Sequence, residues 1–180
     1  EILAREGIEL RLVPSAGAVE NLQRLRDGAG DVSVAFVESG IGGAERTEGV
    51  QSLGTVFYEP LWPFVLGPSP PRFRDAMAGK RVSIGPRGSG TNALCRILFD
   101  TMGMDPGAFT LVELPPREAA AGLLSGELGA VVISSAWDSP VIQDLLHTPG
   151  VTLMPYPRVD ALVHAAVRQR RRSRRTTSRS

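Results

Sequence analysis

The chain has 180 residues, of which 42% are apolar and 22% are charged, a composition that suits one globular domain or two small lobes. Its formal charge is +1, but seven arginines lie in the last 13 residues, and without them the rest of the chain carries −6. An acidic body argues against a nucleic-acid-binding domain, and no apolar run approaches the ~18 residues of a transmembrane helix.

The remaining chemistry-bearing residues are few. The single cysteine, Cys95, leaves no internal disulfide, and its place in the apolar run "ALCRIL" predicts a thiol in the core rather than a nucleophile. His147 and His164 have no partners at ligand spacing, so we expect no metal and no other cofactor. The arginine-rich residues 158–180 are expected to be disordered, or else to contact nucleic acid or anionic lipid.

The first half of the chain predicts two strands around a helix. "ELRLV" (residues 9–13) is typical of a strand, and "AVENLQRLRDG" has the apolar spacing of a helix that ends at Gly28. "DVSVAFV" (residues 31–37) is typical of a strand covered on both faces. Pro60 and Pro63 interrupt the β-like residues 50–67, so we expect that segment to bend or to run along a sheet edge.

The second half alternates strands with helices. A short helix is predicted within residues 68–80. Strands are predicted at residues 81–85, 109–115, 130–134 and 151–157, and helices at residues 91–104, 117–129 and 139–150. This alternation predicts parallel βαβ units.

A glycine-rich turn, "GPRGSGT" (residues 85–91), joins a predicted strand to a predicted helix. Thr91 and Asn92 stand where a P-loop needs Lys and Ser or Thr, and the spacing around Ser89 does not fit a nucleophile elbow. Gly88 and Gly90 fit a dinucleotide fingerprint, with Glu113 near the expected acidic position. That match makes an NAD-dependent oxidoreductase of Rossmann type the alternative interpretation.

Capture of an anion without catalysis is the other function of such a turn. A helix N-terminus has unpaired N–H groups and a partial positive charge, and glycines allow a ligand to approach closely. The turn therefore suits a carboxylate or phosphate. A purely structural role, in which Ser89 or Thr91 only caps the helix, fits the sequence equally well.

Several stretches together resemble the TAXI family of solute receptors, which serve tripartite ATP-independent periplasmic (TRAP) transporters. "VSIGPRGSGTNALCRILFDTMGM" is similar to the family's Gly-Pro-x-Gly-Ser-Gly-Thr segment, and "FYEPLWPFV" to its Tyr-Glu-Pro-Leu crossover. "VPSAGAVENLQRLRDGAGDVSVAFVESG" and "AAAGLLSGELGAVVISSAWDSPVIQDLL" are similar to further segments in the same order. The resemblance covers residues 1–157.

The resemblance implies a type II periplasmic-binding-protein fold, an α/β fold whose two lobes with mixed, mainly parallel sheets close on a small anionic or zwitterionic solute. The protein would be a periplasmic or other extracytoplasmic receptor, not an enzyme, with a TRAP-type membrane permease as its partner. Lobe one and the crossover would be residues 1–63, and lobe two residues 64–157. The residues expected to line the solute site are Gly17, Ala18, Glu38, Ser39, Tyr58, Ser89, Gly90, Thr91, Ser135 and Trp137.

The sequence departs from the family at the site and at both ends. Glu38 stands where the family commonly has Gln, which favours an amino acid over a plain dicarboxylate because the carboxylate could pair with an amine. Tyr58 could equally be a hinge residue, and Trp137 could equally pack in a lobe interface. We expect the first strand of lobe one to lie upstream of Glu1 and further sequence to replace the arginine-rich end, so that lobe one is incomplete and the chain truncated.

Overall fold

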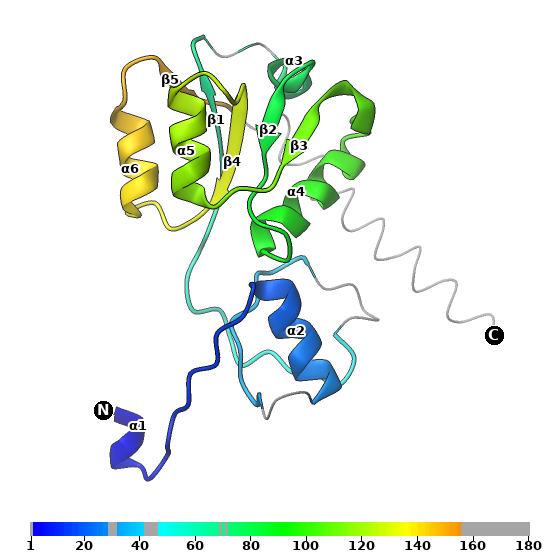
Figure 1. Ribbon diagram of the computed structural model, residues 1–180. Helices are drawn as coiled ribbons and strands as arrows, with labels where there is room; N and C mark the ends of the chain where they lie inside the picture. The colour runs from blue at the N-terminus through cyan, green and yellow to red at the C-terminus, as the bar shows by residue number, and fades with distance from the viewer. Residues whose placement is uncertain (1, 29–31, 42–46, 69, 71, 156–180) are drawn as a thin grey trace, which may run out of the picture.

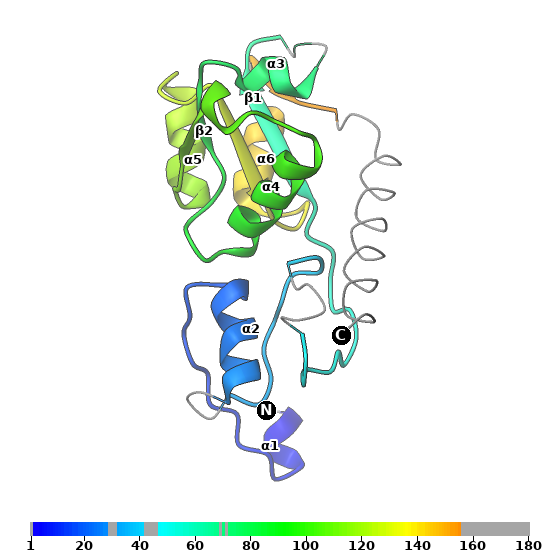
Figure 2. The same ribbon diagram turned by 90° about the vertical axis from the view of Figure 1, so that its right-hand side faces the viewer.

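The computed structural model describes residues 2–28, 32–41, 47–68, 70 and 72–155. Two parts of the molecule are joined by an extended crossover, as Figures 1 and 2 show. We call residues 2–58 the N-terminal part and residues 61–155 the sheet part. The N-terminal part contains the helices α1 (Ile2–Arg5) and α2 (Ala18–Asp27).

The sheet part has five strands in the order β3-β2-β4-β1-β5. The strands are β1 (Leu61–Leu66), β2 (Arg81–Ser83), β3 (Thr110–Val112), β4 (Ala130–Ser134) and β5 (Val151–Leu153). The helices are α3 (Phe73–Met77), α4 (Gly90–Thr101), α5 (Pro116–Leu124) and α6 (Pro140–His147), with a 3₁₀ turn η3 (Pro106–Ala108). Strands β2 to β5 and the four helices of this part were predicted from the sequence, whereas the segment of β1 was expected to bend or to run along an edge.

Two kinds of strand pairing make the sheet mixed. Strand β2 pairs in parallel with β3 and with β4, which confirms the predicted βαβ units around α4 and α5. Strand β1 pairs antiparallel with both β4 and β5. The expected α/β fold with a mixed sheet is therefore observed.

Strand β1 corrects the expectation that its prolines place it at an edge, because it lies between β4 and β5. The carbonyl of Pro63 accepts a hydrogen bond from the Met154 amide, 2.8 Å away and just past the end of β5. The N–H that proline lacks would face the same side. Proline at this position therefore removes no donor from the ladder with β4, which explains why the sheet tolerates it.

The core lies on both faces of the sheet because side chains alternate along each strand. Ala130 and Val132 of β4 pack with residues of α3 and α4, whereas Val131 and Ile133 pack with α5 and α6. Cys95 is fully buried on the α4 face, which confirms the prediction of a core thiol. Burial raises its pKa to about 12, with a smaller contribution from the charge of Glu38.

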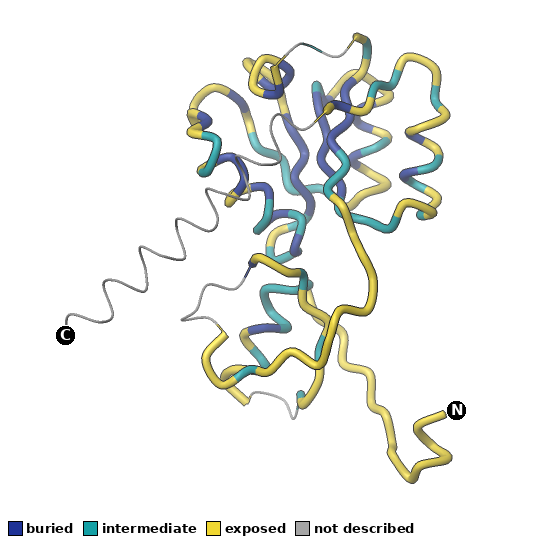
Figure 3. The backbone as a smooth tube through the Cα atoms, turned by 180° about the vertical axis from the view of Figure 1, so that it is seen from behind, coloured by how far each residue is buried: buried dark blue, intermediate teal, exposed yellow. Residues whose placement is uncertain are grey.

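The N-terminal part corrects two predicted strands. Residues 9–13 and 32–37 are extended, but they belong to no strand. Their apolar side chains are largely exposed; Val34 is 70% exposed and Phe36 69%. Figure 3 shows this contrast with the buried sheet part. Among the described residues no neighbouring segment pairs with these two segments in a β-ladder, and apolar alternation alone does not make a strand.

Helix α2 is confirmed, including its end at Gly28, which adopts the left-handed conformation of a helix C-cap. Strand β1 begins at Leu61 and lies wholly in the sheet, while the division of the chain into lobes at residue 63 stays a prediction. Residues 158–180 lie outside the described residues. No helix in the described part of the chain is long and apolar enough to cross a bilayer.

Candidate functional site

The glycine turn after β2 ends in the capped N-terminus of α4. The Ser89 hydroxyl accepts a hydrogen bond from the Asn92 amide at 3.2 Å and donates to the Pro86 carbonyl at 2.7 Å. Ser89 therefore caps helix α4, which is the structural role that the sequence left open. Within the described residues the amides of Gly90 and Thr91 form no hydrogen bond, so this helix end keeps two free donors.

The N-terminus of α2 meets this turn from the other part of the molecule. The Val19 amide donates to the Gly88 carbonyl at 3.3 Å. Gly17, the residue before α2, lies so close to Ser89 that a Cβ there would be 2.9 Å from the Ser89 Cα. Its φ of 137° also favours glycine. Glycine at residue 17 therefore allows the two helix N-termini to approach each other.

Glu38 occupies the space directly over the start of α4. A Cβ added to Gly90 would coincide with the Glu38 carboxylate. The other oxygen of that carboxylate accepts a hydrogen bond from the Ser134 hydroxyl at 2.6 Å. This short contact has the length of a charge-assisted bond. A side chain of the N-terminal part is thus hydrogen-bonded to the end of β4, and it can reach this position because Gly90 has no side chain.

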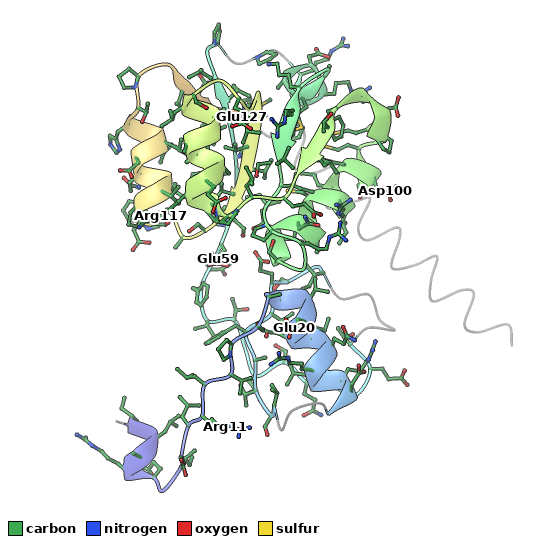
Figure 4. The ribbon with its side chains drawn as sticks, in the orientation of Figure 1. Arg11, Glu20, Glu59, Asp100, Arg117 and Glu127 are labelled. Carbon is green, nitrogen blue, oxygen red and sulfur yellow. The ribbon has the colours of Figure 1, made fainter. Side chains whose placement is uncertain are left out.

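A second carboxylate, Glu59, lies close to this site. It is on the crossover just before β1, as labelled in Figure 4, and its backbone carbonyl accepts a hydrogen bond from Ser134 at 3.3 Å. Partial burial raises the pKa of the Glu59 carboxyl, and the negative charge of Glu38 raises it further. The junction between the two parts is therefore locally acidic.

The predicted site residues fall into two groups. Gly17, Ala18, Glu38, Ser89, Gly90 and Thr91 gather where α2 and α4 meet. Ser39 follows Glu38 and is exposed, and the side chains of Tyr58 and Trp137 are 85% and 68% exposed. Ser135 lies apart from the first group, in an open depression of about 450 Å³ beside the N-termini of α5 and α6.

Ser134 was missed by the sequence analysis, which chose the next residue instead. Strand β4 places Val132 on the face covered by α4, so a residue two positions later points to that same face. The alternation of "AVVIS" could therefore have shown that Ser134, and not Ser135, faces the glycine turn. The position of Glu38 over Gly90 had no such signal, because it depends on a contact between residues 52 positions apart in the chain.

Glu113, the acidic residue of the alternative dinucleotide interpretation, is already engaged. One of its oxygens accepts from Asn92 and from Arg96, at 3.2 and 3.0 Å, and the other accepts from Arg87 at 3.2 Å. The Arg87 contact is the largest cause of a lowered pKa at this carboxyl. A ribose hydroxyl would have to compete with two arginines, which disfavours this interpretation. The described residues contain no group of three or more side chains suited to hold a metal ion.

Comparison with known families identifies the relatives of this chain. A family model described as the NMT1-like family matches residues 1–172. The chain belongs to the NMT1-like family. That match spans both parts of the molecule, so the α2–α4 junction lies within the family's shared region.

Solved structures show the same fold at low identity. The ligand-binding core of GluR0 from Nostoc punctiforme, in complex with L-glutamate, is 19% identical with a TM-score of 0.58, covering 96% of this chain and 82% of that one. An ancestral arginine-binding protein bound to arginine is 17% identical with a TM-score of 0.54, covering 97% and 78%. These likenesses show that this NMT1-like protein has the α/β fold of solute-binding proteins, as the sequence predicted.

A third match is partial. The periplasmic aliphatic sulphonate binding protein SsuA from Escherichia coli is 22% identical with a TM-score of 0.44, over 53% of this chain. The chain spans 33% of the length of SsuA. The matched proteins are binding proteins by name, and the expectation that this chain is not an enzyme stays a prediction.

Proposed function

We propose that this chain is the solute-binding part of an extracytoplasmic receptor for a small carboxylate or amino acid of glutamate-like size. The solute would be held at the α2–α4 junction and passed to a TRAP-type membrane permease. The family and the fold support the coarser statement that this is a solute-binding protein. The identity of the solute, the partner permease and the extracytoplasmic location are the finer parts of the proposal.

The observation that carries the proposal is the carboxylate of Glu38 at the start of α4. Because Gly90 has no side chain, a carboxylate can approach the start of α4 more closely than beside any other residue, and this supports the proposal. The unpaired amides of Gly90 and Thr91 and the partial positive charge of the helix end would attract an anion there. Gly17 and Ala18 bring a second helix N-terminus to the same place.

The remaining predicted residues have smaller or less direct parts in this proposal. Glu38 and Ser39 would face the solute from the N-terminal part. Tyr58 would reach the solute from the crossover, and Ser135 and Trp137 from the loop after β4, only if the two parts close further around it. Such hinge closure is a common motion of two-part binding proteins.

The test is thermal unfolding of the purified chain with L-glutamate, other amino acids, dicarboxylates and NADH. A solute at 100 times its dissociation constant stabilises a protein by ~2.7 kcal/mol. We expect a shift with glutamate-like solutes that Thr91→Val weakens, since the substitution removes a hydroxyl beside the free amides. A transition moved by none of the carboxylates contradicts the proposal, and a shift with NADH alone favours the dinucleotide alternative.

A further inference from the structure

The crossover before β1 is an extended segment with an open backbone edge. Residues 51–60 are all exposed and belong to no strand, and Figure 3 shows them as a continuous exposed stretch between the two parts. Val56 and Tyr58 expose most of their side chains. Within the described residues the amides of Thr55, Phe57 and Glu59 form no hydrogen bond. The crossover therefore offers both backbone donors and apolar side chains to a partner.

Strand β5 leads the chain back toward this edge. It runs antiparallel to β1, with Leu153 opposite Phe64, and the Met154 amide still bonds the Pro63 carbonyl just past the end of β5. Because β1 starts at the crossover, the chain that follows β5 heads toward it. In the same register each later residue lies opposite an earlier one of the crossover, so residue 159 would face Tyr58 and residue 161 would face Val56.

The prolines after β5 fit this continuation. In an antiparallel ladder, residues whose N–H points to the partner strand alternate with residues whose N–H points away. Met154 is of the first kind, because its amide bonds β1. Pro155 and Pro157 occupy positions of the second kind. Their missing N–H groups would thus remove no hydrogen bond, so the ladder can continue past them.

The sequence after these prolines alternates like a strand with one apolar face. In "VDALVHAAV" (residues 159–167) every odd position is apolar, while Asp160 and His164 stand at even positions. In the continued register the odd positions would share a face with Val56 and Tyr58, because paired residues point to the same side of a sheet. The family match reaches residue 172, so this segment belongs to the region shared with relatives.

We propose that residues 158–162 continue β5 as an antiparallel strand along residues 55–59 of the crossover. The strand would give the amides of Phe57 and Glu59 acceptors and would cover Val56 and Tyr58. This inference replaces the expectation of disorder from residue 158 onward. Two chain segments instead of one would then join the two parts, so hinge motion would be limited to bending about this pair of strands. The inference goes beyond the proposed function and does not depend on which solute binds.

Disulfide formation in the full chain tests the register. Residues 56 and 161 would form a non-hydrogen-bonded pair with Cα atoms ~4.5 Å apart, a separation that a disulfide can span. The test variant is Val56→Cys/Ala161→Cys, and the matched control is Val56→Cys/Leu162→Cys, whose side chains would point to opposite faces. Cys95 is fully buried and stays out of the reaction. We expect the intrachain bond to form about tenfold or more faster in the test variant. Equal rates would overturn the inference, because an unpaired chain end would reach both positions alike.

Hydrogen exchange tests the ladder by proline substitution at two adjacent positions. In the proposed strand the amide of residue 160 points to Phe57, whereas the amide of residue 161 points away. We expect the amides of Phe57 and Glu59 to be protected in the wild type and about tenfold or more less protected in Asp160→Pro. Ala161→Pro, the control, should keep this protection. An equal effect of the two substitutions contradicts the proposed pairing.

Two further outcomes would also overturn the inference. The Phe57 and Glu59 amides might exchange in the wild type at the rate of an unstructured chain, in which case the edge stays open. Alternatively, their protection could rise with protein concentration while the cysteine variant cross-links between chains, which would make a second copy the partner. Circular dichroism of each variant checks that the sheet part is folded, and the solute titrations above are read out separately, so failure here leaves the proposed function standing.

Discussion

Gly90→Ala isolates the contact between Glu38 and α4. Gly90 is the first residue of a regular helix, where alanine is accommodated without backbone strain and favours the helix by roughly 0.5–1 kcal/mol. The new Cβ would take the place of the Glu38 carboxylate. Expelling that group breaks its charged hydrogen bond with Ser134, a loss of ~1.5–3 kcal/mol.

The expected net result is a free energy of unfolding lower by about 0.5–2.5 kcal/mol, the difference between these two effects. The sign should reverse in a Glu38→Ala background, where Gly90→Ala meets no carboxylate and only the gain in helix propensity remains. Urea unfolding of the wild type, both single variants and the double variant, followed by tryptophan fluorescence, gives this cycle directly.

The same four proteins can also contradict the proposed contact between Glu38 and Gly90. The coupling between the two substitutions should be about 1.5–3 kcal/mol, the size of the broken hydrogen bond. If Gly90→Ala destabilises the protein equally with and without the Glu38 carboxylate, the two groups are not in contact in solution. Hydrogen exchange at the amides of residues 90 and 91 would then be unchanged by Glu38→Ala as well.

Three other predictions follow from the same contacts and from the core. Gly17→Ala should destabilise the α2–α4 junction by ~1–3 kcal/mol, because its Cβ would meet the Ser89 backbone at a strained φ. Faster hydrogen exchange in α2 would measure this loss. The control is Gly28→Ala, whose Cβ meets nothing within 4 Å and which should cost only the strain of its left-handed φ, ~1–2 kcal/mol. The raised pKa of Glu59 means that the folded protein holds this proton more tightly, so its contribution to stability is lost as pH rises above 4.5. Glu59→Gln should therefore gain stability relative to the wild type as pH rises through that window; urea titrations at several pH values showing no such trend contradict the assignment. Phe64→Ala should cost ~3–5 kcal/mol because this ring is fully buried, and a loss below 1 kcal/mol in calorimetry would refute its place in the core.

The sheet part could be predicted from the sequence because each of its elements carries a local signal. The apolar run of β4 and the helical spacing of α4 depend on residues close in the chain. Ser89 before α4 and Gly28 after α2 have the residue types that helix ends require. These signals need no knowledge of distant contacts.

The N-terminal part could not be predicted in the same way. Residues 9–13 and 32–37 have the composition of strands, yet a strand exists only where a neighbouring chain completes its hydrogen bonds. For β1 the sequence suggested less pairing than the structure shows. Pro63 indicated an edge strand, yet β1 lies inside the sheet, because Pro63 pairs with the segment just past the end of β5 and not with β4 on the side where its N–H is missing. Local composition predicts the tendency to extend, and pairing decides whether a strand forms.

For the candidate site, too, some features can be read from local sequence and others depend on contacts between distant residues. The glycine turn, the helix that follows it and the acidic residue at position 38 can be recognised from residue chemistry and short-range spacing. The contacts of Glu38 with Gly90 and with Ser134 exist only in the folded molecule, because they join residues 52 and 96 positions apart in the chain. Folding of the chain brings these distant residues together, and no pattern of neighbouring residues in the sequence encodes such a contact.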